Sequence, residues 1–267
     1  MTVCIAALCS AENGVSKNVI VASDRMVTLG GFMEFEHQIS KISKLTDKSV
    51  ILVAGDTYRG SKVVDVVKDR LAEIPDNKIQ NIANWVTKVY SECRDELIET
   101  EIFKTRGFTK KEFYENYQTK LLPQLAFQLD QQVITYDFGV QLIVAGVDEL
   151  GSHAFAIYNP GNSIDIHQIG YVAIGSGTLH ATQSLIGFGH SPAIDLKTTV
   201  FCTFASKKRA EVAPGVGKDT DLFIITEQGI KALSQDEIKQ LDEIYEQDYH
   251  KPLTDNVIGK INELPFI

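Results

Sequence analysis

Short apolar runs come in two groups along this chain, and a pair of helical segments follows each group. The first group occupies residues 2–10, 19–23 and 49–54, which are rich in small and β-branched residues. Such runs are typical of strands. Because strands that are apolar on both faces need cover on both sides, we expect two stacked antiparallel sheets with helices outside. The predicted fold is therefore α+β, a four-layer αββα sandwich.

The helical segments are recognised by their spacing. Valines and leucines recur at three- to four-residue intervals over residues 63–71, before Pro75, and a second helical pattern covers 79–101. The second group of strands is expected at residues 140–145, 153–158, 163–168 and 171–174, followed by helices from 179 and over 196–211, and by a last strand at 222–226.

One domain accounts for most of the chain. No repeat or low-complexity linker marks a second one, so residues 1–230 are predicted to form a single unit. The charged and aromatic segment at about 101–137 is predicted to be a mostly helical insertion. Residues 231–267 are predicted to be an extension that packs on the body or on a neighbouring subunit.

Charge and residue types exclude several classes of protein. The net charge is −9 and the lysines and arginines are scattered, which argues against nucleic acid or an anionic membrane as a partner. The apolar start lacks basic residues and is interrupted by Glu12, so it fits neither a signal peptide nor a membrane span. We expect a cytoplasmic protein.

Cysteine and histidine usage gives no sign of a metal. The four cysteines form no C-x-x-C pair, and the six histidines lack metal-ligand spacing. Reduced thiols in a cytosolic protein are the simplest interpretation. No metal and no organic cofactor is predicted.

Several motifs occur in an order that resembles a known family. They are TVCI from Thr2, VASDRMVT from Val21, KISKL from Lys41, Ala54-Gly55, YVAIGSG from Tyr171 and DLFIITEQG from Asp221. Together they resemble proteasome β subunits over roughly residues 2–79 and 138–230, and they are most similar to the bacterial proteasome-like ancestral β-subunit peptidases. The resemblance implies an αββα N-terminal-nucleophile hydrolase that assembles into a self-compartmentalising oligomer such as a ring. Its substrates would be peptides or unfolded proteins, and an ATPase partner is left open.

The resemblance also implies a threonine-type endopeptidase whose nucleophile is Thr2. A hydroxyl is a poor nucleophile unless a base takes its proton, and a free α-amino group with a pKa of about 7.7–8.0 supplies that base. Thr2 must then be the first residue of the mature chain. Because its side chain is small, removal of Met1 would expose it without an autocleaved propeptide. The alternative is a structural threonine near a terminus.

By the same resemblance four more groups surround the nucleophile. Lys41 would place a cation beside the Thr2 hydroxyl, and Asp24 would orient that lysine. The backbone N–H of Gly55 would stabilise the oxyanion, and the hydroxyl of Ser176 would relay a proton or hold the α-amine. Each residue also has a plain structural interpretation, respectively a surface lysine, a turn carboxylate, a turn glycine and a helix-capping serine.

Two positions depart from the family pattern. Met26 stands where an arginine is usual, and Pro214 stands where a serine is usual. Glu211, three residues before Pro214, is the best match to the family's further catalytic acid. These departures favour a second hypothesis, a non-catalytic proteasome-like subunit with a structural or binding role.

Three further alternatives concern the chemistry. The substrate would be a small amide if the insertion or the C-terminal extension reshapes the site. Cys4 would be the nucleophile only if three residues were removed before it, so a buried strand cysteine is the better interpretation. By resemblance Val53 would line the substrate pocket on the acyl side, which favours uncharged side chains there.

Overall fold

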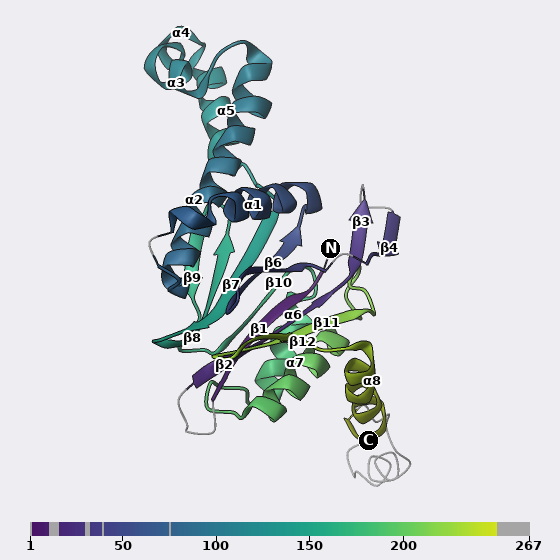
Figure 1. The fold of residues 1–267 in the computed structure, drawn as a ribbon. Helices are drawn as coiled ribbons and strands as arrows, with labels where there is room; N and C mark the ends of the chain where they lie inside the picture. Colours follow the sequence, from purple (N-terminus) through teal and green to yellow (C-terminus); the bar gives the residue numbers. More distant parts are fainter. Residues whose placement is uncertain (1, 11–15, 30–32, 39, 75, 250–267) are drawn as a thin grey trace, which may run out of the picture.

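Two five-stranded sheets are stacked face to face and covered by helices on their outer faces (Figure 1). The computed structural model describes residues 2–10, 16–29, 33–38, 40–74 and 76–249. The predicted α+β class and the four-layer αββα arrangement are confirmed. Within the described residues, no helix combines the length and the apolar character that crossing a membrane requires.

Both sheets are antiparallel throughout. The first has the order β10 (Tyr171–Ile174), β1 (Cys4–Ser10), β2 (Ser16–Asp24), β11 (Thr220–Thr226) and β12 (Gly229–Ala232). The second has the order β5 (Ile42–Thr46), β6 (Ser49–Gly55), β7 (Val140–Asp148), β8 (Gly151–Tyr158) and β9 (Asn162–Asp165). In the first sheet β1 lies between β10 and β2, so residues at its beginning are near the ends of both neighbours.

The alternation of side chains along each strand builds two cores at once. In β1, Cys4, Ala6 and Leu8 pack between the sheets, whereas Ile5 packs under the helices on the other face. In β6, Val50 and Leu52 face the first sheet while Ile51 faces the helices. Because neighbouring side chains of a strand point to opposite faces, a run that is apolar at every position buries both faces.

Four helices form the outer layers. Helices α1 (Thr57–Asp69) and α2 (Ile79–Ile98) cover the second sheet, with a short turn η1 (Leu71–Glu73) between them. Helices α6 (Thr178–Gly187) and α7 (Leu196–Ala210) cover the first sheet. Asp56 caps α1 and Asp195 caps α7, each by accepting a backbone N–H of the first turn.

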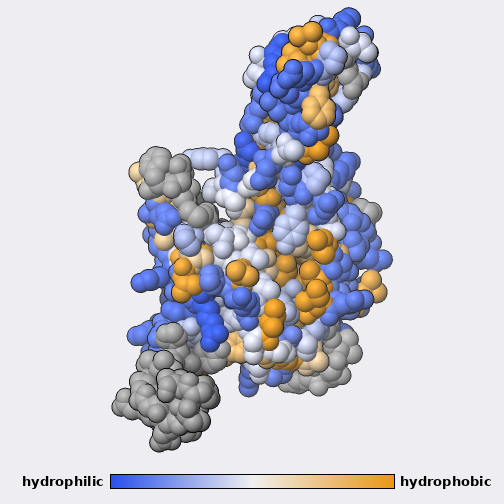
Figure 2. All heavy atoms as spheres, turned by 180° about the vertical axis from the view of Figure 1, so that it is seen from behind, coloured by the Kyte–Doolittle hydropathy of each residue, from blue (hydrophilic) through white to orange (hydrophobic). Residues whose placement is uncertain are grey.

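The insertion projects from the end of α2, beyond the layers (Figure 1). It consists of η2 (Glu99–Phe103), η3 (Lys104–Arg106), α3 (Lys110–Glu112), η4 (Phe113–Tyr117), α4 (Gln118–Lys120) and α5 (Pro123–Ile134). Phe103 and Phe113 are fully buried in a small core of its own, and the left-handed Gly107 ends the first part. Figure 2 shows apolar side chains on this projection and in patches over the body, among charged ones.

Four of the described strands were not expected from the sequence. Strands β3 (Met26–Leu29) and β4 (Met33–Glu36) form a separate hairpin, and β5 and β12 extend the edges of the sheets. The C-terminal segment contains α8 (Gln235–Ile244) and η5 (Tyr245–Tyr249), and Leu241 and Tyr245 pack against the core under α7. The rest of the extension lies outside the described residues.

Candidate active site

Thr2 lies just before strand β1, between the ends of the two neighbours of that strand. Cys4 pairs with Ser23 near the end of β2 and with Ile174 at the end of β10. Asp24 therefore approaches Thr2 from one side, and the turn after β10 approaches from the other. Gly175 in this turn has a φ of +92°, and an added Cβ would come within 2.3 Å of the Thr2 carbonyl oxygen. Only glycine allows this approach.

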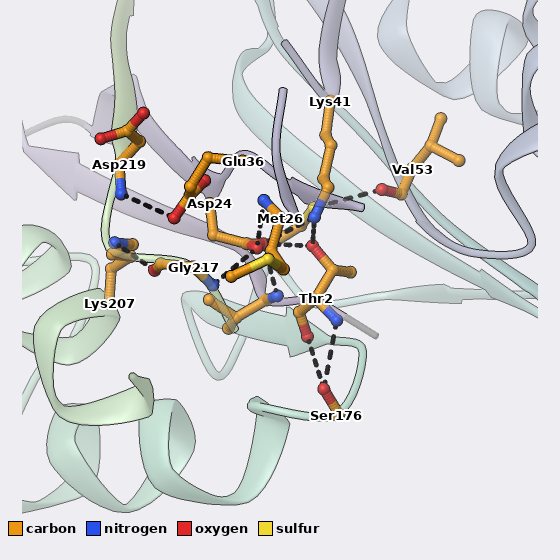
Figure 3. Close-up of polar contacts among 12 residues, drawn as sticks. Thr2, Asp24, Met26, Glu36, Lys41, Val53, Ser176, Lys207, Gly217 and Asp219 are labelled. Atoms are coloured by element: carbon orange, nitrogen blue, oxygen red, sulfur yellow. Dashed lines mark hydrogen bonds and ion pairs between the residues drawn. The ribbon is translucent and has the colours of Figure 1, made fainter. Parts of the chain in front are cut away.

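The Thr2 hydroxyl is in contact with a carboxylate and with an ammonium (Figure 3). Thr2 Oγ1 donates to Asp24 Oδ1 and accepts from Lys41 Nζ. Lys41 Nζ also donates to Asp24 Oδ1 at 2.9 Å, which closes a triangle of three side chains. Lys41 is brought here by its position just before β5, the edge strand of the opposite sheet. The site is therefore assembled from both sheets.

Asp24 is fully buried and is held by backbone donors as well. Its Oδ1 accepts the N–H of Val3 at 2.9 Å, while Oδ2 accepts the N–H of Met26 at 2.9 Å and of Gly217 at 3.0 Å. A buried carboxylate is tolerated only when such donors and a cation replace water. The orientation of Asp24 is consequently fixed from several directions.

The direction of the Gly55 amide follows from the strand pairing. Val53 donates its N–H to the Lys41 carbonyl at 3.1 Å, on the β5 side of β6. Because amide directions alternate along a strand, the N–H of Gly55 points to the same side as that of Val53. Gly55 lies beyond Ile42, the first residue of β5, and there it lines the first cavity. Its φ is +100°, and a Cβ would come within 2.1 Å of the Gly139 carbonyl oxygen. The position suits an oxyanion donor.

Ser176 contacts the backbone of Thr2. The backbone nitrogen of Thr2 donates to Ser176 Oγ at 3.1 Å, and Ser176 Oγ lies 3.3 Å from the Thr2 carbonyl and 3.1 Å from the Pro214 carbonyl. These contacts place the serine hydroxyl beside the nitrogen that would become the α-amine. At position 214 the chain thus contributes a backbone oxygen instead of a side-chain hydroxyl.

Met26 contacts Asp24 through its backbone. The contact is made by its N–H, a group that any residue except proline supplies. The neighbouring Arg25 turns away and binds Asp221, with its Nη2 2.5 Å and its Nε 3.0 Å from Oδ1. This partner raises the pKa of Arg25 above its ordinary value. The arginine at 25 therefore supports β11 and not Lys41.

Glu211 does not contact Thr2, Asp24 or Lys41 in the described contacts. It accepts from Lys207 Nζ at 2.8 Å, and the same fully buried ammonium donates to the carbonyls of Gly217 at 2.8 Å and Lys218 at 2.7 Å. Burial lowers the pKa of Lys207, whereas Glu211 opposes that shift. We call residues 215–219 the Gly217 loop. Glu211 acts on the site only through Lys207 and this loop.

Lys207 and Glu36 were missed by the sequence analysis. Glu36, at the end of β4, accepts the N–H of Lys218 at 2.6 Å and of Asp219 at 3.3 Å. It holds the outer side of the Gly217 loop, while Lys207 holds the inner side (Figure 3). The only sequence signal is the Lys207–Glu211 pair at i, i+4 on a helix, and such pairs are usually surface contacts.

Two cavities meet at the nucleophile. The first, of about 460 Å³, is lined by Val53, by the hairpin residues Met26 and Phe35, and by one face of α1. The second, of about 740 Å³, is lined by the ends of β7 and β8 and by the turn at Gly175 and Ser176. They share only Thr2 and Gly55 among their lining residues, so Thr2 lies between them.

Cys4 lies under the first cavity but is not poised to react. Its Sγ contacts the Val53 carbonyl at 3.4 Å, and complete burial raises its thiol pKa from 9.0 to about 12 despite the neighbouring Lys41. Across the part of the chain that the structure describes, no three His, Cys, Asp or Glu side chains converge as metal ligands would.

A comparison with solved structures supports the fold, whereas two comparisons of the sequence found no match. No family model matches the sequence, and no curated protein does. Among solved structures, a Gly-1 mutant of Anbu from Hyphomicrobium sp. strain MC1 matches with a TM-score of 0.63 at 15% sequence identity, and the match covers 99% of this chain and 98% of that one. The chain therefore shares the overall fold of this Anbu structure, with its two stacked antiparallel sheets between helices.

Proposed function

We propose that the chain is a threonine-type peptidase or amidase whose nucleophile is the hydroxyl of Thr2, in a mature chain that begins at this residue. The observation that carries the proposal is the triangle of Thr2 Oγ1, Asp24 and Lys41. A cation beside a hydroxyl stabilises its alkoxide form, and the carboxylate of Asp24 keeps that cation charged and oriented. The α-amine of Thr2 takes the hydroxyl proton, and Ser176 holds that amine within 3.1 Å.

The proposed reaction has two steps. In the first step the Thr2 oxygen attacks the substrate carbonyl, and the Gly55 N–H stabilises the oxyanion. The leaving amine of the substrate then takes the proton from the Thr2 α-amine and departs, which leaves an ester on Thr2. Water then hydrolyses the ester. Loss of one oxyanion donor typically costs about 2.7–4 kcal/mol in the barrier. The backbone atoms of Met26 and Pro214 still contact Asp24 and Ser176, so the orientation of these two groups does not depend on the side chains at positions 26 and 214.

Assembly into a homo-oligomer is part of the proposal. Leu125, Phe127 and Ile134 of α5 and Leu179 and Ile186 of α6 are 42–64% exposed. Exposed apolar side chains on these two separate elements are candidates for contacts with other copies of the chain. A closed or helical assembly would enclose the Thr2 site and restrict it to peptides and unfolded chains.

The test is covalent labelling of Thr2. Purified protein is incubated with a β-lactone or a peptide boronate, and intact mass and peptide sequencing locate the modification. We expect Met1 to be absent and one adduct on Thr2, none in Thr2→Ala, and partial labelling in Thr2→Ser, which keeps a hydroxyl. Retained Met1, or a free Thr2 that does not react in the assembled oligomer, would leave a structural or binding subunit instead.

A further inference from the structure

The second cavity contains a single charged side chain. Its lining residues, in the described part of the chain, include Gln141, Tyr158 and Asn159, and the only carboxylate among them is that of Asp137. No lysine, arginine or histidine lines it. By contrast, the first cavity is lined by Lys41, Lys68 and His37 together with Asp65. The two sides of the nucleophile therefore differ in charge.

The path of the proton decides which part of a substrate enters each cavity. In the proposed reaction, the amine of Thr2 receives the hydroxyl proton and passes it to the leaving nitrogen. That nitrogen must consequently lie on the side of the Thr2 nitrogen, which contacts Ser176. Ser176 lines the second cavity and not the first. The leaving segment thus faces the second cavity, and the acyl segment faces Val53 and α1.

The Asp137 carboxylate is exposed and its position is fixed. Its Oδ1 accepts the N–H of Gly139 at 2.8 Å, which leaves Oδ2 for a ligand. Two guanidinium groups lie near the adjoining backbone, but Arg94 binds the Tyr136 carbonyl and Arg59 binds the Phe138 carbonyl, and neither lines the cavity. An approaching cation would therefore meet a negative charge on this wall.

On these grounds we propose that the second cavity binds the leaving segment of a peptide and that Asp137 selects a basic side chain in it. The inference rests on the proposed function and narrows its substrate. A small amide has no segment to fill about 740 Å³ beyond the scissile bond, whereas a peptide that continues past this bond does. The enzyme would be an endopeptidase with a preference for lysine or arginine on the leaving side.

The experiment measures acyl transfer to added amines. An acyl-enzyme is formed from a peptide coumarin amide, and dipeptide amides beginning with arginine, glutamine or glutamate compete with water for it. In transfer, the ester bond to Thr2 Oγ breaks, an amide bond forms to the acceptor's α-nitrogen, and the proton lost by that nitrogen returns to the Thr2 oxygen. Mass spectrometry of the amide and acid products gives the partition ratio for each acceptor.

We expect the arginine acceptor to exceed the glutamine acceptor by about two- to fivefold, as for an exposed ion pair, and the glutamate acceptor to be poorest. Asp137→Asn should remove this order of acceptor preference, because it removes the negative charge. Asparagine retains the oxygen that accepts the N–H of Gly139, so the backbone should stay in place. Asp137→Lys should reverse it. Asp47→Asn, which removes an exposed acid outside both cavities, should leave it unchanged.

The outcomes separate the two proposals. If no acyl-enzyme forms, the proposed function fails and the inference fails with it. If an acyl-enzyme forms but only water attacks it, the second cavity does not bind the leaving segment. If transfer occurs with equal ratios for the three acceptors, or with the same order in Asp137→Asn, Asp137 is not the selecting residue.

Discussion

Replacing Lys207 with methionine should loosen the Gly217 loop and with it the orientation of Asp24. The side chains have similar volume, so the change removes the ammonium and leaves the packing nearly intact. Three hydrogen bonds of 2.7–2.8 Å disappear, to Glu211, Gly217 and Lys218. Removing one partner of a buried ion pair costs about 3–5 kcal/mol when the other partner is left without a cation. Glu211 retains Lys208 at 3.7 Å, so the lower end of this range applies. We expect a loss of this size in the free energy of unfolding.

A second variant tests whether the charge pair is responsible. Glu211→Gln keeps an oxygen acceptor for Lys207 and should cost about 1–2 kcal/mol, the value of one hydrogen bond. In the double variant no carboxylate remains that has lost its buried cation, so the cost of the double variant should fall short of the sum of the two single costs by about 1–2 kcal/mol. Lys197→Met, on an exposed position of the same helix, should stay within about 0.5 kcal/mol.

The assays are urea unfolding at fixed protein concentration and the rate of covalent labelling of Thr2 under native conditions. Because Gly217 donates to Asp24 Oδ2, Lys207→Met should also slow labelling by about tenfold, which corresponds to about 1.4 kcal/mol in the barrier. A variant that loses less than about 1 kcal/mol of stability and labels at the wild-type rate would refute the argument. A stability loss without slower labelling would show that the loop does not orient Asp24.

Three shorter predictions follow from single positions. Gly55→Ala should abolish Thr2 labelling and lower the urea midpoint, because a φ of +100° and a Cβ 2.1 Å from the Gly139 carbonyl force β6 to shift. Unchanged labelling and an unchanged midpoint would contradict this shift. Cys4, whose pKa is raised from 9.0 to about 12, should be alkylated by iodoacetamide at pH 8 about 10³-fold more slowly in the folded than in the urea-unfolded protein, as peptide mapping would show. Burial lowers the pKa of His190 below 6.5, so below pH 6.5 the unfolded state binds more protons than the folded state, and the free energy of unfolding should fall as the pH drops. His190→Gln should flatten that part of the curve of stability against pH. An equally steep curve in the variant would contradict the role of His190.

The fold could be predicted largely because its strands bury both faces. Runs such as residues 2–10 and 49–54 are apolar at nearly every position, and only a layered arrangement covers them. The missed strands lack that signal. β4 reads Met-Glu-Phe-Glu and all of its side chains are exposed, and β12 is an edge strand whose positions are only partly covered. Such strands form because a hairpin or a neighbouring edge supplies partners, which no local pattern records.

The candidate site, like the fold, could be predicted from the sequence only in part. Thr2, Asp24, Lys41, Gly55 and Ser176 were chosen by their order along the chain, and the structure brings all five together. Whether they catalyse a reaction is the subject of the labelling test. Glu211 was chosen on the same grounds, but it lies one layer behind the site and contacts Lys207.

By itself, the sequence determined the layered architecture, because strand alternation and helical spacing are properties of the chain read in one dimension. The order of its motifs supplied the set of candidate residues. Only the tertiary structure decided how Met26 and Pro214 serve the site, since both contribute backbone atoms whose direction depends on the packing of distant strands. It also decided that Lys207 is buried on acceptors from another loop, and that two cavities of different charge meet at Thr2. These features arise from contacts between residues far apart in sequence, and such contacts exist only once the two sheets have stacked.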